Sequence, residues 1–393
     1  MPVDAEPPQT LGDLARSMQD RGVRRVHVLG WRDMADEASG GSEMHANEFM
    51  TRWAAAGFDI VERTSHAPGL ASIERRNGYD IVRRGGRYGV FPRAVASEIA
   101  RRMGPRDALV EIWNGVPWFS PVWFRGPRLT FMHHVHGPMW DQLFPPRVAT
   151  LGRLLEARVA PPFYRRTEMV TPSEATRAEL LHLGLHPDRV TAVENGVDPK
   201  WSPGGPRHPR PLVLGVGRLA PVKRFGLLLE AAATARESVP DLELVIVGEG
   251  PDRAELESWI ARHGAASWVS LPGRLSDDDL RDLYRRAWVL SNDSLAEGWG
   301  LTISEAGACG TPAVVSDISG HRCSVVHGET GLLCEPGQLG PTLASVLRDP
   351  DRLDRMGRAA LARSATLTWD ASALGILRVL ERDVTRRVSA RGR

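Results

Sequence analysis

The stretch Glu297-Gly298-Trp299-Gly300-Leu301-Thr302-Ile303-Ser304-Glu305 places two carboxylates around a glycine-rich turn. The apolar residues 288–290 before it predict a buried strand, and the apolar and small residues after the turn predict a helix packed on a sheet. A helix that begins in such a turn offers unpaired backbone N–H groups and its positive dipole end to an anion. Two carboxylates beside an anion site suit a hydroxyl-rich phosphate compound, so the stretch indicates a sugar nucleotide as ligand.

Strands and helices alternate along the chain on both sides of one proline-rich segment, residues 199–211. This segment contains five prolines and two glycines, which exclude a helix or a central strand and indicate a linker. The pattern predicts an α/β protein with two Rossmann-like, doubly wound parallel sheets that face each other across a cleft. We expect an N-terminal acceptor-binding domain over residues 1–200 and a C-terminal nucleotide-sugar-binding domain over residues 201–370.

Composition limits the classes of function. The chain has 393 residues, and 50 basic residues nearly balance 48 acidic ones, so the charge gives no general attraction for nucleic acid. No apolar run approaches the roughly 18 residues that a membrane helix needs, and the N-terminus lacks the pattern of a signal peptide. The three cysteines have no metal-ligand spacing, which is typical of a reducing cytoplasm.

The first half contains a glycine pair at the end of the loop, residues 31–41, that follows its first predicted strand, residues 26–30. Gly40 and Gly41 precede a helix that we expect Ser42 to cap. Ligands of open α/β sheets bind at the carboxyl ends of strands. A ligand-binding loop and a tight turn required only by packing both explain this glycine pair.

Three histidines, His133, His134 and His136, follow a predicted strand at residues 129–132. Their spacing does not converge naturally on one metal ion, and no cysteine or carboxylate cluster lies near them in sequence. We therefore favour hydrogen-bonding active-site groups at the carboxyl end of the strand over a metal site. Structural packing of the loop is the remaining alternative.

The second half supplies cations for a phosphate. Arg218 and Lys223 lie on one loop, where the arginine offers a bidentate fork and the lysine a point charge. Lys223 is one of only two lysines in the chain, which favours a specific role. Glu305, one helical turn inside the glycine-rich stretch, can accept hydrogen bonds from both hydroxyls of a ribose. Glu297 can accept hydrogen bonds from hydroxyls of a transferred sugar.

The segment EGWGLTISEAGACGTPAVVSD at 297–317 is similar to the nucleotide-binding signature of the retaining glycosyltransferases of family 4, which have the GT-B fold. Supporting motifs follow in the family's order: GGSE at 40–43, the histidines at 131–136, ENGVD at 194–198, VGRLAPVKR at 216–224, VGEGP at 247–251 and GLLCEPG at 331–337. The resemblance extends over residues 23 to 385. Trp299 replaces the usual phenylalanine, and Ala313 shifts the usual valine by one position.

The resemblance assigns roles to residues. It implies that Glu305 binds the ribose, Glu297 the donor sugar, and Arg218 and Lys223 the diphosphate. His133 matches the active-site histidine, although His134 could hold that place. The remaining substrate-binding residues implied are Gly40, Gly41, Asn195, Gly248, Arg274, Gly298, Trp299, Gly300, Leu301 and Thr302. A C-terminal helix over residues 371–393 is expected to cross back onto the first domain.

For function, the resemblance implies transfer of a hexose-type sugar from UDP-sugar or GDP-sugar to a hydroxyl of a small molecule, glycan or lipid. The transfer would proceed with retention by a front-face mechanism, without a metal or other cofactor. A GT-B sugar-nucleotide epimerase or phosphorylase, and a non-catalytic nucleotide-sugar-binding protein, are the alternatives. We expect a bacterial, cytoplasmic protein; the arginines of residues 382–393 leave open a peripheral contact with the inner face of the membrane.

Overall fold

The computed structural model describes residues 10–37, 39–137 and 139–391, which form two compact units. The first unit combines the chain up to Gly196 with the segment Trp369–Arg393, and the second unit is Val197–Thr368. Each unit contains one sheet flanked by helices, so the two predicted α/β units with parallel sheets are confirmed. The predicted domain limits lay at residues 200 and 370, within a few residues of the limits of these units.

The first unit has an eight-stranded sheet in the order β3-β4-β2-β1-β5-β6-β7-β8. Only the β3–β4 pair is antiparallel among its described pairings. The strands are β1 (Arg25–Leu29), β2 (Asp59–Thr64), β3 (Ile73–Arg76), β4 (Tyr79–Arg83), β5 (Ala108–Ile112), β6 (Arg128–Phe131), β7 (Glu168–Thr171) and β8 (Val190–Ala192). The chain reverses its direction of winding between β1 and β5, and this switch point is where α/β sheets bind ligands.

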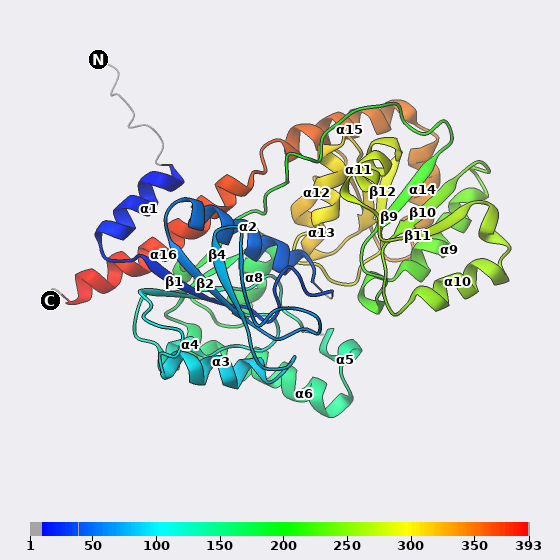
Figure 1. Cartoon of the computed structure of the whole chain (residues 1–393). Coiled ribbons are helices and arrows are strands. Elements are labelled where there is room, and N and C mark those ends of the chain that lie inside the picture. The colour runs from blue at the N-terminus through cyan, green and yellow to red at the C-terminus, as the bar shows by residue number, and fades with distance from the viewer. Residues whose placement is uncertain (1–9, 38, 138, 392–393) are drawn as a thin grey trace, which may run out of the picture. The chain divides into compact units, whose positions relative to one another are not determined.

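The helices of the first unit cover both faces of that sheet (Figure 1). They are α1 (Leu11–Asp20), α2 (Gly41–Ala55), α3 (Val90–Ile99), α4 (Ser120–Trp123), α5 (Met139–Leu143), α6 (Pro146–Leu154), the π-helical turn η1 (Leu155–Val159), α7 (Pro161–Tyr164), α8 (Glu174–His182), the 3₁₀ turn η2 (Pro187–Arg189) and α16 (Trp369–Arg391). Helix α1 lies before the first strand that the sequence predicted, in a stretch for which no element was predicted. Thr10 caps that helix through the amide of Asp13, and Leu14 and Met18 are buried.

Helix α16 is part of the core of the first unit, although it follows the second unit in sequence (Figure 1). It contacts α1, α2, β6 and β7. Ile376 and Leu380 are fully buried in the same cluster as Val28 of β1. The indole Nε1 of Trp53 on α2 donates a hydrogen bond to the carbonyl of Ala373 at 3.0 Å.

The second unit has a six-stranded parallel sheet in the order β11-β10-β9-β12-β13-β14. Its strands are β9 (Leu212–Val216), β10 (Glu243–Val247), β11 (Val269–Gly273), β12 (Val289–Asn292), β13 (Ala313–Ser316) and β14 (Gly331–Cys334). Its helices are η3 (Pro221–Lys223), α9 (Phe225–Arg236), α10 (Arg253–Arg262), η4 (Ala265–Ser267), α11 (Asp277–Arg286), α12 (Leu301–Ala308), α13 (Ser319–Ser324), α14 (Leu339–Leu347) and α15 (Pro350–Ser364). The switch point of this sheet lies between β9 and β12.

The proline-rich segment at 199–211 packs against the second unit and is not a free linker. Trp201 is 6% exposed and belongs to the core cluster that contains Tyr284 and Leu290. The Lys200 ammonium pairs with Asp277 at 2.8 Å. The prolines prevent regular structure here, but the apolar indole still has to be buried, and the second unit provides the surface for it.

Candidate active site

Two loops meet at the switch point of the second sheet. One follows β9 and contains the predicted phosphate-binding cations, and the other follows β12 and leads into the glycine-rich stretch. The amide of Leu295 donates to the carbonyl of Val222 at 2.8 Å. The Arg224 guanidinium donates to the carbonyl of Asp293 at 2.6 Å and contacts its carboxylate at 3.1 Å. These bonds hold residues that are about 70 positions apart in sequence as one surface.

Lys223 and Glu297 form an ion pair at the centre of this surface. Their side chains are only 19% and 16% exposed, and the Ser294 hydroxyl donates to the same carboxylate at 2.8 Å. Burial alone would raise the pKa of Glu297, but the nearby Lys223 and His321, together with these hydrogen bonds, lower it below the ordinary value. Glu297 is therefore an ionised hydrogen-bond acceptor at neutral pH, which suits a partner that offers hydroxyl groups.

Gly300 begins helix α12 in a left-handed conformation, with φ of +93°. A Cβ atom at this position would lie 2.9 Å from the Cδ1 of Ile303, so the turn requires glycine both for its backbone and for space. Among the residues that the structure describes, no side chain caps the amides at the start of α12. Leu301 and Thr302 therefore present backbone N–H groups suited to an anion.

The other residues of the turn have different surroundings. The Trp299 side chain is 3% exposed, and its Nε1 donates to the Ser304 hydroxyl at 2.9 Å, so the indole holds the turn from inside. Gly298 is partly exposed. A Cβ atom on Gly320 would lie 2.2 Å from the backbone carbonyl oxygen of Glu297. A side chain at Gly320 would therefore displace the turn.

Glu305 points into the second unit and is 8% exposed. Burial raises the pKa of Glu305 to about 7, although the hydrogen bond from Tyr284 and the charge of Lys200 act in the opposite direction. The Tyr284 hydroxyl donates to Oε2 of Glu305 at 2.9 Å. The two glutamates of the stretch thus differ: Glu297 is held ionised, whereas Glu305 changes its charge near neutral pH.

The other predicted residues of the second unit lie at the carboxyl ends of β9, β10 and β11. Arg218 and Arg274 are both exposed there. Gly248 has φ of +144°, and a Cβ on it would lie 1.9 Å from the Gly217 carbonyl oxygen. Gly248 therefore allows the loop after β10 to pack on the loop that contains Arg218, which is a structural reason for glycine at this position.

In the first unit, Gly40 and Gly41 lie at the start of α2, after the loop that follows β1. The prediction that Ser42 caps this helix is wrong, because α2 begins at Gly41 with Gly40 as its N-cap. The buried Glu43 carboxylate accepts hydrogen bonds from the Gly40 amide at 2.8 Å and the Ser42 hydroxyl at 2.9 Å. Arg32 of the same loop contacts Glu43 at 3.3 Å.

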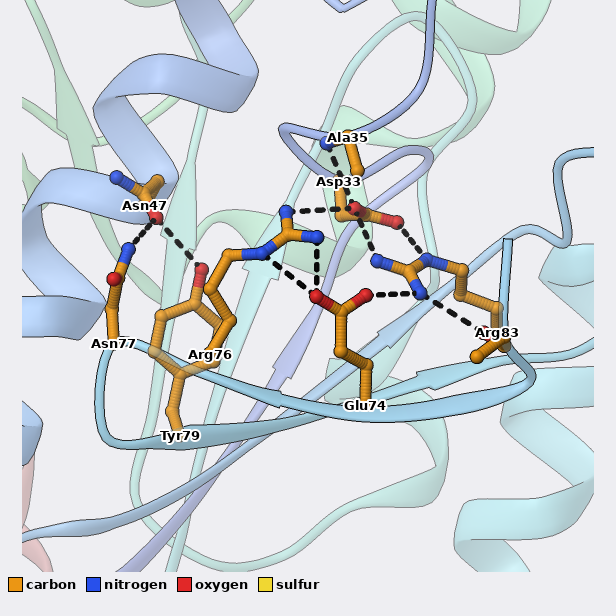
Figure 2. A network of polar contacts seen from close by, with 9 residues as sticks. Asp33, Ala35, Asn47, Glu74, Arg76, Asn77, Tyr79 and Arg83 are labelled. Atoms are coloured by element: carbon orange, nitrogen blue, oxygen red, sulfur yellow. Dashed lines mark hydrogen bonds and ion pairs between the residues drawn. The ribbon is translucent and has the colours of Figure 1, made fainter. Parts of the chain in front are cut away.

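A buried ion-pair network holds the loop after β1 against β4 (Figure 2). Arg83 and Asp33 are 0% and 2% exposed and make two hydrogen bonds, of 2.6 and 2.8 Å. Arg83 also donates to Glu74 of β3 at 2.7 Å. Burial opposes ionisation of Asp33, but the hydrogen bonds and charge of Arg83 keep its pKa below the ordinary value. The β3–β4 hairpin thus fixes the loop that leads to Gly40.

His133 follows β6 and is 8% exposed. Its ring packs on Phe131, with centroids 4.4 Å apart, and meets the His45 ring edge-on at 5.3 Å. Within the described parts of the chain, neither ring nitrogen has a hydrogen-bond partner. Burial lowers the pKa of His133 well below the ordinary value, and the neighbouring His45 and His134 add to this. A neutral, buried imidazole without a partner is suited to hydrogen-bond a ligand.

The other two histidines of the run pack against each other, and a buried carboxylate holds the backbone beside them. His134 and His136 stack with centroids 4.6 Å apart. The amides of His136 and Gly137 each donate to the buried Glu156 carboxylate at 2.9 Å. Among the described residues, no group of three histidine, cysteine, aspartate or glutamate side chains is arranged to hold a metal ion.

Asn195 lies in the loop that follows β8, at the end of the first unit. It is 4% exposed, and its Oδ1 has no hydrogen-bond partner within the described part of the chain. Like His133, it is a buried polar group that a bound molecule could satisfy.

Family models match the chain along most of its length. Residues 39–201 match the model described as Glycosyltransferase Family 4, and residues 200–363 match the model described as Glycosyl transferases group 1. The chain belongs to the family 4 glycosyltransferases. This family 4 chain is 34% identical over 236 residues to the D-inositol 3-phosphate glycosyltransferase of Frankia alni, a match that covers 54% of the chain and 58% of that relative. The chain spans about half the length of the curated relatives it matches.

Solved structures confirm the GT-B type of fold for this family 4 chain. Sucrose-phosphate synthase from Thermosynechococcus elongatus has a TM-score of 0.78 at 21% identity, over 91% of this chain and 98% of that one. HepE of Anabaena, solved in complex with UDP and glucose, has a TM-score of 0.70 at 16% identity, over 93% of this chain and 100% of that one. At such identities the likeness concerns the fold.

Sequence reasoning on this family 4 member missed the partners of the predicted residues. Tyr284 on Glu305, Ser294 on Glu297 and His45 beside His133 are absent from the predicted set. His321 was missed as well; its Nδ1–H donates to the Ser316 carbonyl at 2.8 Å. The position of His321, just after β13, was a usable signal, since it lies at the same carboxyl edge as the glycine-rich turn.

Proposed function

We propose that the protein is a retaining glycosyltransferase that moves a hexose-type sugar from a nucleotide-diphosphate sugar to a hydroxyl acceptor. One observation carries the proposal: in the sequence, a helix N-terminus at Gly300 that no described side chain caps lies between Glu297, which is ionised, and Glu305, whose pKa is raised to about 7. An anion and two separate sets of hydroxyl groups match these three features. A nucleotide-diphosphate sugar contains all of them in one molecule.

In this proposal the donor binds mainly to the second unit. The diphosphate lies at the start of α12, where the amides of Leu301 and Thr302 and the cations of Arg218 and Lys223 neutralise its charge. Glu305 accepts the two ribose hydroxyls, and Glu297 accepts hydroxyls of the sugar. Lys223 then has both Glu297 and the phosphate as partners. UDP and GDP are the leading candidates for the nucleotide.

The reaction breaks the bond between the anomeric carbon and the phosphate oxygen, and the leaving diphosphate keeps the electron pair. The acceptor oxygen forms the new bond on the same face of the sugar and passes its proton to a leaving phosphate oxygen. Lys223, Arg218 and the helix amides stabilise the developing negative charge, so the step needs no metal ion. His133, neutral and buried, hydrogen-bonds a hydroxyl of the sugar or acceptor in the reacting complex.

The acceptor is a hydroxyl compound of the cytoplasm or of the membrane surface. The Frankia relative is named for an inositol 3-phosphate acceptor, so a phosphorylated cyclitol is the first soluble acceptor to test. Lipid-linked and free glycan acceptors form the second set.

A thermal-shift panel of UDP, GDP, ADP and dTDP, each with its glucose conjugate, tests donor binding, because a ligand that binds the folded state raises the melting temperature. We expect one nucleotide to stabilise the protein and Lys223→Ala to abolish that shift. Proton NMR of the product then reports the anomeric configuration, and an inverted product contradicts the proposed mechanism. Conversion of the donor sugar in the absence of any acceptor would indicate an epimerase. Binding of the nucleotide sugar without turnover of any acceptor would indicate a non-catalytic binding protein.

A further inference from the structure

Exposed apolar side chains gather on one segment of the first unit, residues 146–163. Among the described residues, thirteen large hydrophobic side chains are exposed, and five of them lie here. They are Val148 (47%), Leu151 (65%), Leu154 (46%), Val159 (42%) and Phe163 (49%). The segment comprises α6, η1 and α7, and α6 lies at the periphery of the first unit (Figure 1). We call these residues, with the arginines among and after them, the α6–α7 surface.

Exposed apolar and basic side chains lie together on α6. Arg147, Leu151 and Leu154 are spaced at i, i+4 and i+7, so they share one face of this helix, and all three are exposed. Arg158 is exposed in the π-helical turn that follows. Such a stripe of leucines bordered by arginines is typical of helices that lie in a membrane interface.

The opposite face of the same helix is firmly anchored. Glu156 is 1% exposed, and it accepts hydrogen bonds from the amides of His136 and Gly137 and from the Trp140 indole. Gly152 packs so closely on Trp140 that a Cβ there would lie 2.4 Å from the ring. These contacts fix the buried face of the segment in place. The exposed apolar side chains therefore belong to its solvent-facing side.

The charge of the α6–α7 surface is almost entirely positive. Arg147, Arg158, Arg165 and Arg166 are exposed, and none of them forms an ion pair within the described residues. The acidic Asp141 nearby is paired with Arg153. An anionic surface would therefore meet four arginine side chains without displacing any internal partner.

A basic cavity is lined by arginines that follow α7 in sequence. It has a volume of about 440 Å³ and is lined by Arg165, Arg166, His186, Asp188, Arg189 and Arg386. Arg189 and Arg386 pair with Glu168, at 2.8 and 2.5 Å, and the Asp188 carboxylate lies 3.7 Å from His186. The two remaining arginines, Arg165 and Arg166, give the cavity its net positive charge. The size and charge of the cavity fit a phosphate headgroup.

We propose that the α6–α7 surface docks the protein on an anionic lipid membrane. The apolar side chains enter the interface between headgroups and acyl chains, and the arginines contact lipid phosphates. The sequence left open a contact through the C-terminal arginines, but Arg382 and Arg386 pair with Glu168, and Arg387 pairs with Asp383. Gly392 and Arg393 lie outside the described residues.

Charge favours a membrane over a second copy of the chain. A symmetric dimer built on the α6–α7 surface would place the same four arginines opposite each other. No helix among the residues that the structure describes combines the length and the apolar character needed to span a bilayer. The proposed contact is accordingly peripheral.

Flotation of the full chain with phosphatidylcholine vesicles, with and without 30% phosphatidylglycerol, tests the proposal. We expect binding to the anionic vesicles only, and weaker binding at 0.5 M salt. Arg147→Gln with Arg158→Gln should weaken binding roughly 30-fold, since each arginine near an anionic surface contributes about fivefold. Leu151→Asp should weaken it at least roughly tenfold. Leu227→Asp, at an exposed position (42%) on α9 of the second unit, is the matched control and should bind normally.

Several outcomes overturn the proposal. Failure of the unmodified chain to bind anionic vesicles does so directly, as does equal binding by the unmodified, Arg147→Gln/Arg158→Gln and Leu151→Asp chains. A dimer in light scattering that Leu151→Asp dissociates, without vesicle binding, would assign the surface to a second copy. Melting temperatures of the variants within about 2 °C of the unmodified chain show that they are folded, because the changed side chains are exposed.

Discussion

Glu305 should lose a proton when the nucleotide sugar binds. Its pKa of about 7 means that about 0.9 of the molecules carry the proton at pH 6 and about 0.1 at pH 8. Two ribose hydroxyls donate to the carboxylate and favour its ionised form, which lowers the pKa in the complex. Binding at pH 6 should therefore release close to one proton, and binding at pH 8 almost none.

The same coupling between protonation of Glu305 and donor binding predicts how the donor affinity depends on pH. Because the pKa is raised in the free protein, protonation of Glu305 competes with the donor below pH 7, and affinity increases as pH rises towards 7 and is level above it. Between pH 5.5 and pH 7.5 the dissociation constant should fall roughly 25-fold if the pKa in the complex lies well below 5.5.

Isothermal titration calorimetry in two buffers of different ionisation enthalpy measures the number of protons released. The ligand should be the intact nucleotide sugar, because its diphosphate diester does not titrate in this range. Glu305→Gln, with nearly the same shape, should bind more weakly and release no proton at either pH. A release that is unchanged in this variant, or absent in the unmodified protein at pH 6, refutes the assignment of Glu305 to the ribose.

Three further predictions concern single positions. Asp33→Ala leaves the fully buried Arg83 guanidinium without its main partner, so urea unfolding should show a loss of about 3–5 kcal/mol. Gly300→Ala imposes a φ of +93° on a residue with a Cβ and should cost about 1–3 kcal/mol in calorimetry, with weaker donor binding. His133→Ala should lower kcat by at least roughly tenfold and leave donor affinity unchanged, measured by steady-state kinetics and calorimetry.

Matched variants separate these causes from general damage. Asp80→Ala breaks an exposed ion pair with Arg75 and should cost less than about 1 kcal/mol. Gly310→Ala has a similar φ of +85° with no atom within 4 Å of the added Cβ, and it should leave donor affinity intact. Equal losses from Asp33→Ala and Asp80→Ala would contradict the assigned importance of the buried network. An unchanged rate for His133→Ala would remove that histidine from the site.

The alternation of apolar runs and glycine-rich loops was enough to predict both α/β units, because buried parallel strands and their loops leave a strong local pattern. The strand β3 (Ile73–Arg76) escaped prediction, since an edge strand with two arginines and a glutamate lacks that pattern. Trp201 was assigned to a linker because prolines dominate its neighbourhood. Its burial depends on a surface formed by residues about 80 positions later.

The candidate site also combines features that the sequence predicted with features that it could not predict. The types of residue at 297–305 were sufficient to indicate a sugar nucleotide, because the backbone and carboxylates to which we assign its binding lie in one local motif. The pairing of Lys223 with Glu297, and of Tyr284 with Glu305, depends on distant segments, and the sequence contains no local sign of it. The ionisation of the two glutamates follows from those pairings and from burial, so it could not be predicted either.

The place of α16 in the chain has a consequence for biosynthesis. Residues 197–368 are translated before α16, yet α16 supplies Ile376 and Leu380 to the core of the first unit. On the ribosome, the first unit therefore waits with its α1 and α2 surfaces uncovered while the second unit emerges and can fold completely. The first unit can therefore complete its core only after residues 197–368 have been synthesised, although its strand β1 is made first.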